Sequence, residues 1–348
     1  MAEKFTIKDI HSPGVAEKFD ELTLQDLERL LLKKNLFVDT GCPACHNLNV
    51  AQAFEYQSLN YRRCCACETL YISPAPTESA HLEYVVTSSA MAYWRDCMPE
   101  DMKKSRRPMY QDRVEYSKSM FSKLGISPKV SLEIGAGNGE FAEALSDATT
   151  IEQIVLLEPQ ELNLRNNNIQ IIKGGFEELE CTQKLFDVIF AWEVLEHILE
   201  PDNFLRLIRI VLKPDAPLIF STPNERSVET RELGTNSTNI LFDHVRLYNP
   251  TAIEALLKRN GFRVLELSTP GKLDTQRLVE MKAKSPDYFS HNPALNFILD
   301  RDDDVLESFQ MFLQKSLRSS HMRVVAVVDG GWNGSNVPLI SNSPYASD

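Results

Sequence analysis

Short apolar segments alternate with amphipathic helical segments from residue 130 onward, and this alternation constrains the fold more than any other feature. We expect strands at 130–135, 151–159, 169–175, 186–192, 217–224, 262–267 and 322–328. We expect helices at 138–148, 194–214 and 249–262. The last helix has Asn249 as its N-cap, Pro250 at its first position and Gly261 just past its end. This alternation predicts an α/β fold, in which helices cover both faces of a parallel sheet.

The rest of the chain changes in character from part to part. Residues 1–37 form an N-terminal segment with a short amphipathic helix expected at 23–34, where Thr23 is the N-cap. Cysteines mark residues 38–76, and residues 77–127 look helical and aromatic. The α/β part spans 128–330 with a helical insertion at 270–320, and a polar tail occupies 331–348.

The charge balance argues against a nucleic-acid partner. The net charge of −12 is the opposite of the cationic excess that neutralises phosphates, and the basic run at 102–110 is typical of a solvated helix face. No segment has the roughly 20 apolar residues of a membrane span, and the N-terminus has no apolar signal-peptide core. We therefore expect a soluble, cytoplasmic protein.

Four of the seven cysteines form two CxxC pairs, Cys42 with Cys45 and Cys64 with Cys67. Two such turns aim four thiolates at one point and complete a tetrahedron, so the pattern predicts a metal site. Zinc is the default metal, and an iron site of the rubredoxin kind uses the same spacing. Because protein fills all four positions, we expect a structural zinc rather than a catalytic one.

A glycine-rich turn follows the first strand of the α/β part, in the stretch LEIGAGNGEF at 132–141. The lysine that completes a Walker phosphate loop is absent, which excludes that loop. Glu140, at the start of the next helix, would repel the pyrophosphate of a dinucleotide. Glu158 ends the second strand, where a carboxylate accepts hydrogen bonds from a ribose diol, a group that NAD and S-adenosylmethionine share.

With these motifs the chain resembles the class I S-adenosylmethionine-dependent methyltransferases. The resemblance runs from 130 to 267 through LEIGAGNGEF, LLEP, IIKGGFEEL, FDVIFAWEVLEHILEP, PLIFSTPN and DHVRLYNPTAIEALLKRNGF. It implies a Rossmann-like sheet of seven strands whose last strand, 322–328, is antiparallel. It implies that glycines lie under the methionine portion of the cofactor, Glu158 at its ribose and Phe176 at its adenine. The implied cofactor-binding residues are Glu133, Gly135, Ala136, Gly137, Glu158, Pro159, Phe176, Glu177, Ala191 and Trp192.

A zinc unit ahead of such a domain is similar to two arrangements. One occurs in sugar methyltransferases that act on nucleotide-linked or polysaccharide sugars, and the other in ribosomal RNA base methyltransferases. The segment after the sheet looks like that of polysaccharide-locus enzymes, and the chain lacks the large C-terminal domain of sugar C-methyltransferases. We therefore predict O-methylation of a sugar or a similar small hydroxylated metabolite. The alternatives are an RNA base methyltransferase, a sugar C-methyltransferase and a zinc-containing binding protein without activity.

Methyl transfer to a hydroxyl needs a base, and a histidine that titrates near neutral pH suits that role. His197 lies one helical turn after Glu193, so the two side chains can share a face. His244 follows the loop after the fifth strand, beside Asp243, which can orient it. Either histidine is a candidate base.

Overall fold

The computed structural model describes residues 13–97, 100–162, 164, 166–182 and 184–330. Its larger part is a seven-stranded sheet in the order β10-β11-β8-β7-β4-β5-β6. The strands from β8 to β6 run parallel, and β11 is antiparallel to both of its neighbours. This confirms the predicted α/β sheet with its antiparallel last strand. The strands are β4 (Val130–Ile134), β5 (Gln153–Glu158), β6 (Ile169–Lys173), β7 (Val188–Trp192), β8 (Pro217–Pro223), β10 (Phe262–Ser268) and β11 (His321–Val328).

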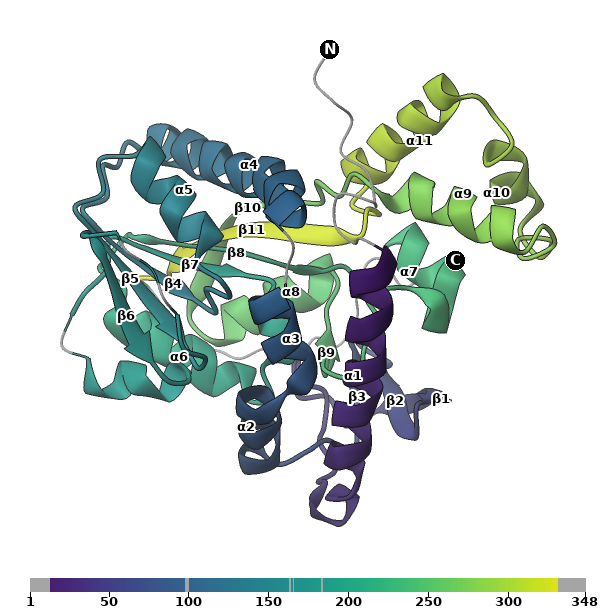
Figure 1. Cartoon of the computed structure of the whole chain (residues 1–348), viewed down its shortest axis with the longest axis horizontal. Coiled ribbons are helices and arrows are strands. Elements are labelled where there is room, and N and C mark those ends of the chain that lie inside the picture. The colour runs from purple at the N-terminus through teal and green to yellow at the C-terminus, as the bar shows by residue number, and fades with distance from the viewer. Residues whose placement is uncertain (1–12, 98–99, 163, 165, 183, 331–348) are drawn as a thin grey trace.

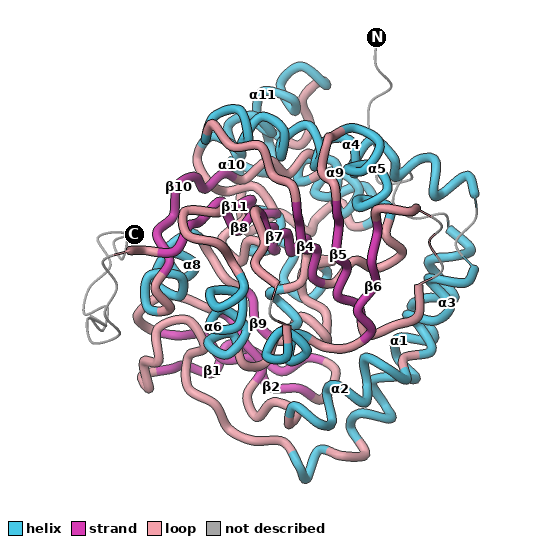
Figure 2. Tube along the Cα trace, turned by 90° about the vertical axis from the view of Figure 1, so that its left-hand side faces the viewer, coloured by secondary structure: helices cyan, strands magenta, loops and turns pink. Residues whose placement is uncertain are grey.

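Helices cover both faces of this sheet (Figure 1), and the side chains of β7 alternate between them. Val188, Phe190 and Trp192 belong to the apolar cluster under α4 (Glu100–Leu124) and α5 (Glu140–Ala148). Ile189 and Ala191 belong to the cluster over α6 (Pro201–Val211) and α8 (Pro250–Arg259). A strand that is apolar on both faces is typical of the centre of a parallel sheet, and Figure 2 shows the parallel strands side by side.

Helix α8 is the element whose ends the sequence predicts best. The side chain of Asn249 accepts a hydrogen bond from the backbone N–H of Ala252, and Gly261 has a left-handed φ of 78° just past the helix. The helix expected at 194–214 is instead divided, because the 3₁₀ turn η4 (Leu195–His197) precedes α6, which starts at Pro201.

The helix expected from Thr23 begins earlier, so that prediction is wrong. Helix α1 spans Pro13–Leu31, and Thr23 lies inside it, where its hydroxyl donates to the carbonyl of Phe19 one turn before. A threonine makes this backward bond as readily as a cap bond, so its presence alone does not mark a helix start. Helices α2 (Glu78–Thr87) and α3 (Ser89–Cys97) lead from the cysteine-containing part to α4.

Three helices separate β10 from β11, where the sequence indicates a helical insertion: α9 (Asp274–Lys284), α10 (Pro293–Ile298) and α11 (Asp303–Lys315). They share a small apolar cluster with α7 (Val228–Leu233) and project to one side of the sheet (Figure 1). The polar tail expected at 331–348 lies outside the described residues. Within the described ranges, no helix combines the length and the apolar character needed to cross a membrane.

A second sheet has four strands in the order β1-β2-β3-β9. β1 (Val50–Tyr56), β2 (Leu59–Cys64) and β3 (Leu70–Ile72) lie in the cysteine-containing part. β9 (Arg246–Leu247) comes from much later in the chain, between β8 and α8. A two-residue strand has no periodic pattern, so the sequence gives no sign of it. The cysteine-containing part therefore shares a sheet with the segment that follows β8.

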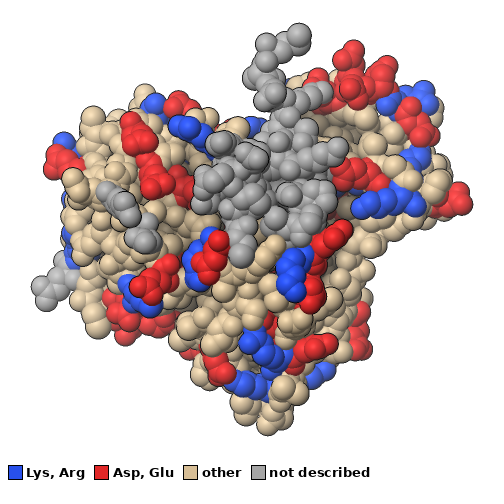
Figure 3. Space-filling view, viewed as in Figure 1, with Lys and Arg blue, Asp and Glu red and all other residues tan. Residues whose placement is uncertain are grey.

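Lys and Arg are interspersed with Asp and Glu on the face shown in Figure 3. Among the described residues on that face, no broad basic area is visible. This distribution agrees with the acidic balance of the sequence and does not favour a nucleic-acid surface there.

Candidate active site

A cavity of about 440 Å³ opens at the carboxyl ends of β4, β5 and β7, the edge where parallel sheets bind ligands. Helices α2, α3 and α4 supply its other wall through side chains such as Tyr84, Trp94 and Tyr110. Two residues singled out from the sequence, Ala191 and His244, do not line it. The ones that do are Glu133, Gly135, Ala136, Gly137, Glu158, Pro159, Phe176, Glu177, Trp192, His197 and Asp243.

The glycine turn forms the floor of this cavity. Gly135 and Gly137 have left-handed φ angles of 68° and 57°, which other residues adopt only with strain. A Cβ on Gly135 would lie 2.7 Å from a methyl carbon of Val194, whereas a Cβ on Gly137 would meet nothing within 4 Å. Gly135 is therefore required by packing, and Gly137 leaves room for a bound molecule. Glu140 also lines the cavity, where we expected it to disfavour a pyrophosphate.

Glu158 holds the neighbouring loops together from the end of β5. One carboxylate oxygen accepts from the N–H of Gly137 at 3.0 Å, and the other from the N–H of Gln160 at 3.1 Å. Burial raises the pKa of Glu158, and these two hydrogen bonds oppose the shift. The carboxylate thus lies beside the glycine turn, with its remaining lone pairs available to a ligand in the cavity.

Glu133 and two arginines of α4 form a charged group at the other end of the glycine turn. Glu133 is buried, and its Oε2 has no hydrogen-bond partner among the described residues. Burial raises the pKa of Glu133 well above its ordinary value, and the charge of Arg113 opposes that rise. Arg113 lies over the ring of Trp192, and Arg106 lies over that of Trp94. Sequence reasoning missed both arginines, because nothing in a solvated basic helix distinguishes the cations that face inward.

The cavity wall beyond Glu158 follows β6. Gly174, Gly175, Phe176 and Glu177 line the cavity there, at the start of the 3₁₀ turn η3 (Phe176–Cys181). The Phe176 ring packs edge-to-face against Phe204 of α6, with ring centroids 5.5 Å apart. This contact fixes an apolar surface at the cavity edge.

Of the two candidate histidines, His197 lines the cavity and His244 does not. Nδ1 of His197 lies 2.8 Å from the main-chain oxygen of Asp243 and 3.9 Å from a carboxylate oxygen of the same residue. Because a carbonyl oxygen can only accept, Nδ1 carries the proton and Nε2 is left as the basic atom. Asp243 therefore orients His197, whereas the sequence suggested that it orients His244.

His244 packs edge-to-face against His197, with ring centroids 4.9 Å apart, and its Nδ1 lies 2.9 Å from the main-chain oxygen of Asn239. Burial and the neighbouring His197 lower the pKa of His244 to about 4. His81 of α2, which the sequence did not single out, lines the cavity, and the same two causes lower its pKa to about 4. Both imidazoles are therefore neutral supports around His197 at neutral pH.

Glu193 directly follows β7 with a left-handed φ of 55°, a strained conformation for a side-chain-bearing residue, and like His197 it lines the cavity. Its carboxylate accepts from the hydroxyl of Ser221 and lies 3.3 Å from Nε2 of His321. Burial alone would raise the pKa of Glu193, but His321 and Arg113 outweigh it and leave the pKa lowered. The cavity thus contains a fixed negative charge beside the candidate base.

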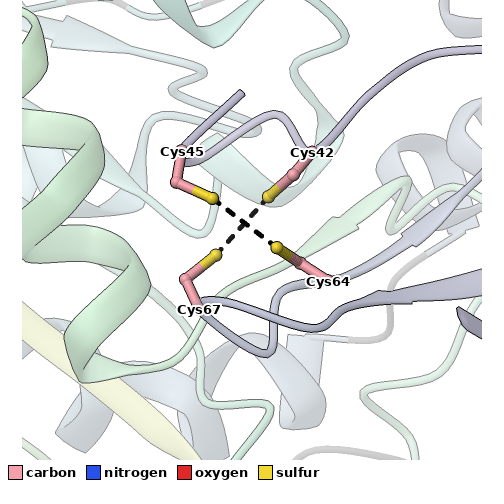
Figure 4. A group of neighbouring side chains, drawn as sticks. All are labelled: Cys42, Cys45, Cys64 and Cys67. Atoms are coloured by element: carbon pink, nitrogen blue, oxygen red, sulfur yellow. Dashed lines mark hydrogen bonds between the residues drawn. The ribbon is translucent and has the colours of Figure 1, made fainter. Parts of the chain in front are cut away.

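The four cysteines of the CxxC pairs come together (Figure 4), and none of them lines this cavity. All are buried, and their sulfur atoms lie within 4.8 Å of one another. Cys42 and Cys67 sulfurs are 3.4 Å apart, and Cys45 and Cys64 sulfurs 3.5 Å. Zinc–sulfur bonds of about 2.3 Å in a tetrahedron separate the sulfurs by about 3.8 Å, so this arrangement fits a zinc ion. Cys65 lies outside the cluster and is exposed. Cys181 is exposed as well, so the core position that the sequence favours for it is wrong.

Comparison with known proteins defines the class of the larger part. A family model described as a methyltransferase domain matches residues 103–267. Together with the sheet order, this identifies these residues as a class I methyltransferase domain. The segments that line the floor of the cavity, from β4 to η4, lie within the matched range.

The chain is similar in sequence to curated proteins, and solved structures resemble it. The chain is similar to the ubiquinone biosynthesis O-methyltransferase of Histophilus somni strain 2336, with 30% identity over 34% of this chain and 55% of that protein. It is also similar to the malonyl-(acyl-carrier protein) O-methyltransferase of Halalkalibacterium halodurans, with 32% identity over 27% of this chain and 39% of that protein. The plantazolicin methyltransferase BpumL has a TM-score of 0.43 at 13% identity, over 72% of this chain and 98% of its own. The chain spans about half the length of the curated relatives it matches first.

Proposed function

We propose that this protein is an S-adenosylmethionine-dependent O-methyltransferase whose acceptor is a small hydroxylated molecule. The observation that carries the proposal is the hydrogen bond from the N–H of Gly137 to the carboxylate of Glu158, in an open cavity. A carboxylate beside a glycine turn at this position can accept hydrogen bonds from a ribose diol. The matched methyltransferase domain and the relatives named as O-methyltransferases support the same reaction.

The residues of the cavity suit each portion of this cofactor. Glu158 would accept from the ribose hydroxyls, and the Phe176 surface with Glu177 would receive the adenine. Glu133, with its unpartnered oxygen, suits the ammonium group of the methionine portion, and Arg113 suits its carboxylate. When bound, S-adenosylmethionine supplies a methyl group on a sulfonium, and it leaves as S-adenosylhomocysteine.

His197 is the proposed base. Its Nε2 would take the proton of the acceptor hydroxyl while the oxygen–methyl bond forms, and the Asp243 carbonyl keeps the ring in the required tautomer. The carboxylates of Asp243 and Glu193 line the same wall and would stabilise the imidazolium that results. His244 acts as a positioning residue, because it contacts the His197 ring and does not line the cavity.

The acceptor side of the cavity favours an apolar or aromatic body that carries the hydroxyl. Its walls are largely hydrocarbon and aromatic, which offers few hydrogen bonds to the several hydroxyls of a sugar. The lining residues of this kind are Leu82, Tyr84, Val85, Met91, Trp94, Ile198 and Leu199. The predicted sugar acceptor keeps one argument in its favour, since a sugar ring can stack on Tyr84 or Trp94.

The second proposed ligand is a structural zinc ion held by Cys42, Cys45, Cys64 and Cys67. The spacing of the sulfurs supports it, and all four ligands come from the protein. Such an ion would stabilise residues 38–76, which contain only three short strands, β1, β2 and β3.

A transfer assay with radiolabelled S-adenosylmethionine tests the acceptor. We expect methylation of a catechol in preference to a nucleotide-linked hexose, and mass spectrometry locates the methyl group. Methylation of the hexose alone would restore the sugar prediction. If His197→Gln methylated the better acceptor as fast as the unaltered protein, the base assignment would be wrong.

A further inference from the structure

The cysteine-containing unit contacts the segment that carries Asp243 and His244, and it does so from both sides. Before these residues, the hydroxyl of Tyr61 in β2 donates to the carbonyl of Leu241 at 3.2 Å. After them, the N–H of Ile72 in β3 donates to the carbonyl of Val245 at 3.1 Å. Each end of the segment 241–245 is therefore hydrogen-bonded to a strand of the second sheet, Leu241 to β2 and Val245 to β3.

The contacts continue through β9 to a metal ligand. Arg246 is 1% exposed, pairs with Tyr71 across the sheet and donates from Nη1 to the carbonyl of Ile72 at 3.0 Å. Asn249, fully buried, donates from Nδ2 to the carbonyl of Cys67 at 2.8 Å while its oxygen caps α8. A side chain that fixes the helix start thus also binds the backbone of a cysteine of the proposed zinc site.

The cofactor side of the cavity has no such link. Over the described part of the chain, no hydrogen bond joins residues 38–76 to the turns at 135–139, 158–160 or 174–177. The hydrogen bonds from 38–76 into the domain reach residues 202, 225–226, 241–249 and 259. The hydrogen bonds of the metal-holding unit therefore reach the side of the cavity where His197 is oriented and not the turns at 135–139, 158–160 and 174–177, although the cysteines share an apolar cluster with Ile134 and Leu157.

We infer that the Cys42–Cys45–Cys64–Cys67 metal site is a positioning device for the segment 241–245, so that metal occupancy sets the orientation of Asp243 and His197 without governing cofactor affinity. The physical reason is that holding four buried thiols together without an ion costs free energy. If the thiols separate, Cys67 and the adjoining ends of β2 and β3 move with them. The carbonyl of Asp243 would then lose its fixed distance to Nδ1 of His197. The consequence for methyl transfer rests on the proposed function, but the coupling itself does not.

Hydrogen exchange of the full chain tests the coupling without an acceptor. We compare the zinc-loaded protein with the same protein after chelation, and follow the amides of 239–249 beside those of β4 and β5. We expect exchange in 239–249 to become about tenfold faster on zinc removal, with β4 and β5 still protected, since local openings differ in free energy across a fold. Calorimetric titration with S-adenosylhomocysteine should give an affinity within about threefold of the loaded protein.

A pair of conservative variants separates the coupling from general loss of folding. Tyr61→Phe removes the hydroxyl that holds Leu241, whereas Tyr71→Phe removes a buried hydroxyl that has no partner. The His244 amide also donates to the carbonyl of Leu241. With zinc still bound, Tyr61→Phe should therefore make exchange at this amide about fivefold faster, and Tyr71→Phe should leave it unchanged.

The inference is overturned if exchange in 239–249 is the same with and without zinc, or if the two variants exchange equally. Loss of protection in β4 and β5 together with 239–249 would also overturn it, because zinc would then support the whole domain. If S-adenosylhomocysteine fails to bind the loaded protein, the proposed function fails, and the exchange data still decide the coupling.

Discussion

Nδ1 of His197 donates to the main-chain oxygen of Asp243 across 2.8 Å, so a residue after β8 sets the tautomer of a residue after β7. This relationship leaves Nε2 as the acceptor atom on the cavity wall, and it supports the proposal that His197, rather than His244, is the base.

Replacing His197 should slow methyl transfer without weakening cofactor binding. We expect His197→Gln to lower kcat by about 10²- to 10⁴-fold, the usual contribution of a general base, with the affinity for S-adenosylhomocysteine nearly unchanged. The matched control is His291→Gln, because His291 is an exposed histidine paired with Glu232. Equal kcat values in the two variants would contradict the assignment.

The metal site should depend on Cys64 and not on its neighbour. Cys64 is buried in the cluster, whereas Cys65 is exposed. Atomic emission should find about one zinc per chain in the unaltered protein and in Cys65→Ser, and much less in Cys64→Ser. The melting temperature should fall only in Cys64→Ser, because metal binding contributes to folding. Full zinc occupancy in Cys64→Ser would count against the site.

The stability of the protein should decrease as the pH falls from 6.5 to about 4. The pKa values of His81 and His244 are lowered to about 4 in the folded protein, so the unfolded chain binds more protons in this window. Each extra proton lowers the free energy of unfolding by about 1.4 kcal/mol per pH unit. Both contributions are fully present above pH 6.5 and are lost on acidification.

Urea unfolding at several pH values measures this effect. His81→Gln should make the dependence shallower by nearly one proton between pH 4 and 6.5, because glutamine does not titrate. His291→Gln again serves as the exposed control. The explanation fails if His81→Gln and the unaltered protein show the same slope.

The sheet and much of the cofactor side could be predicted from the sequence, because local pattern determines them. Apolar runs gave the strands, and the glycine spacing with Glu158 placed the cavity. The buried face of α4 was not predictable, since Arg106 belongs to the basic run at 102–110 and Arg113 follows it in the same helix, and which of these cations face inward depends on tertiary packing. Strand β9 and the role of Asp243 were missed for the same reason, because both arise from contacts across more than 40 residues of sequence.

The start of the helix expected at 23–34 illustrates the opposite limit. Thr23 satisfied a local rule for a helix start, yet its hydroxyl bonds backward to Phe19 inside a longer helix. Leu27 and Leu30 of this longer helix belong to the apolar cluster of the second sheet, a tertiary contact that no local pattern contains.

The central claim is that S-adenosylmethionine occupies the cavity beside Glu158, and calorimetric titration with S-adenosylhomocysteine tests it most directly. The unaltered protein should bind one equivalent, and Glu158→Ala should bind about 100-fold more weakly, because two hydrogen bonds to a carboxylate are lost. Glu161→Ala, at an exposed carboxylate three residues away, should bind like the unaltered protein. No binding to the unaltered protein, or equal binding by the two variants, would contradict the account.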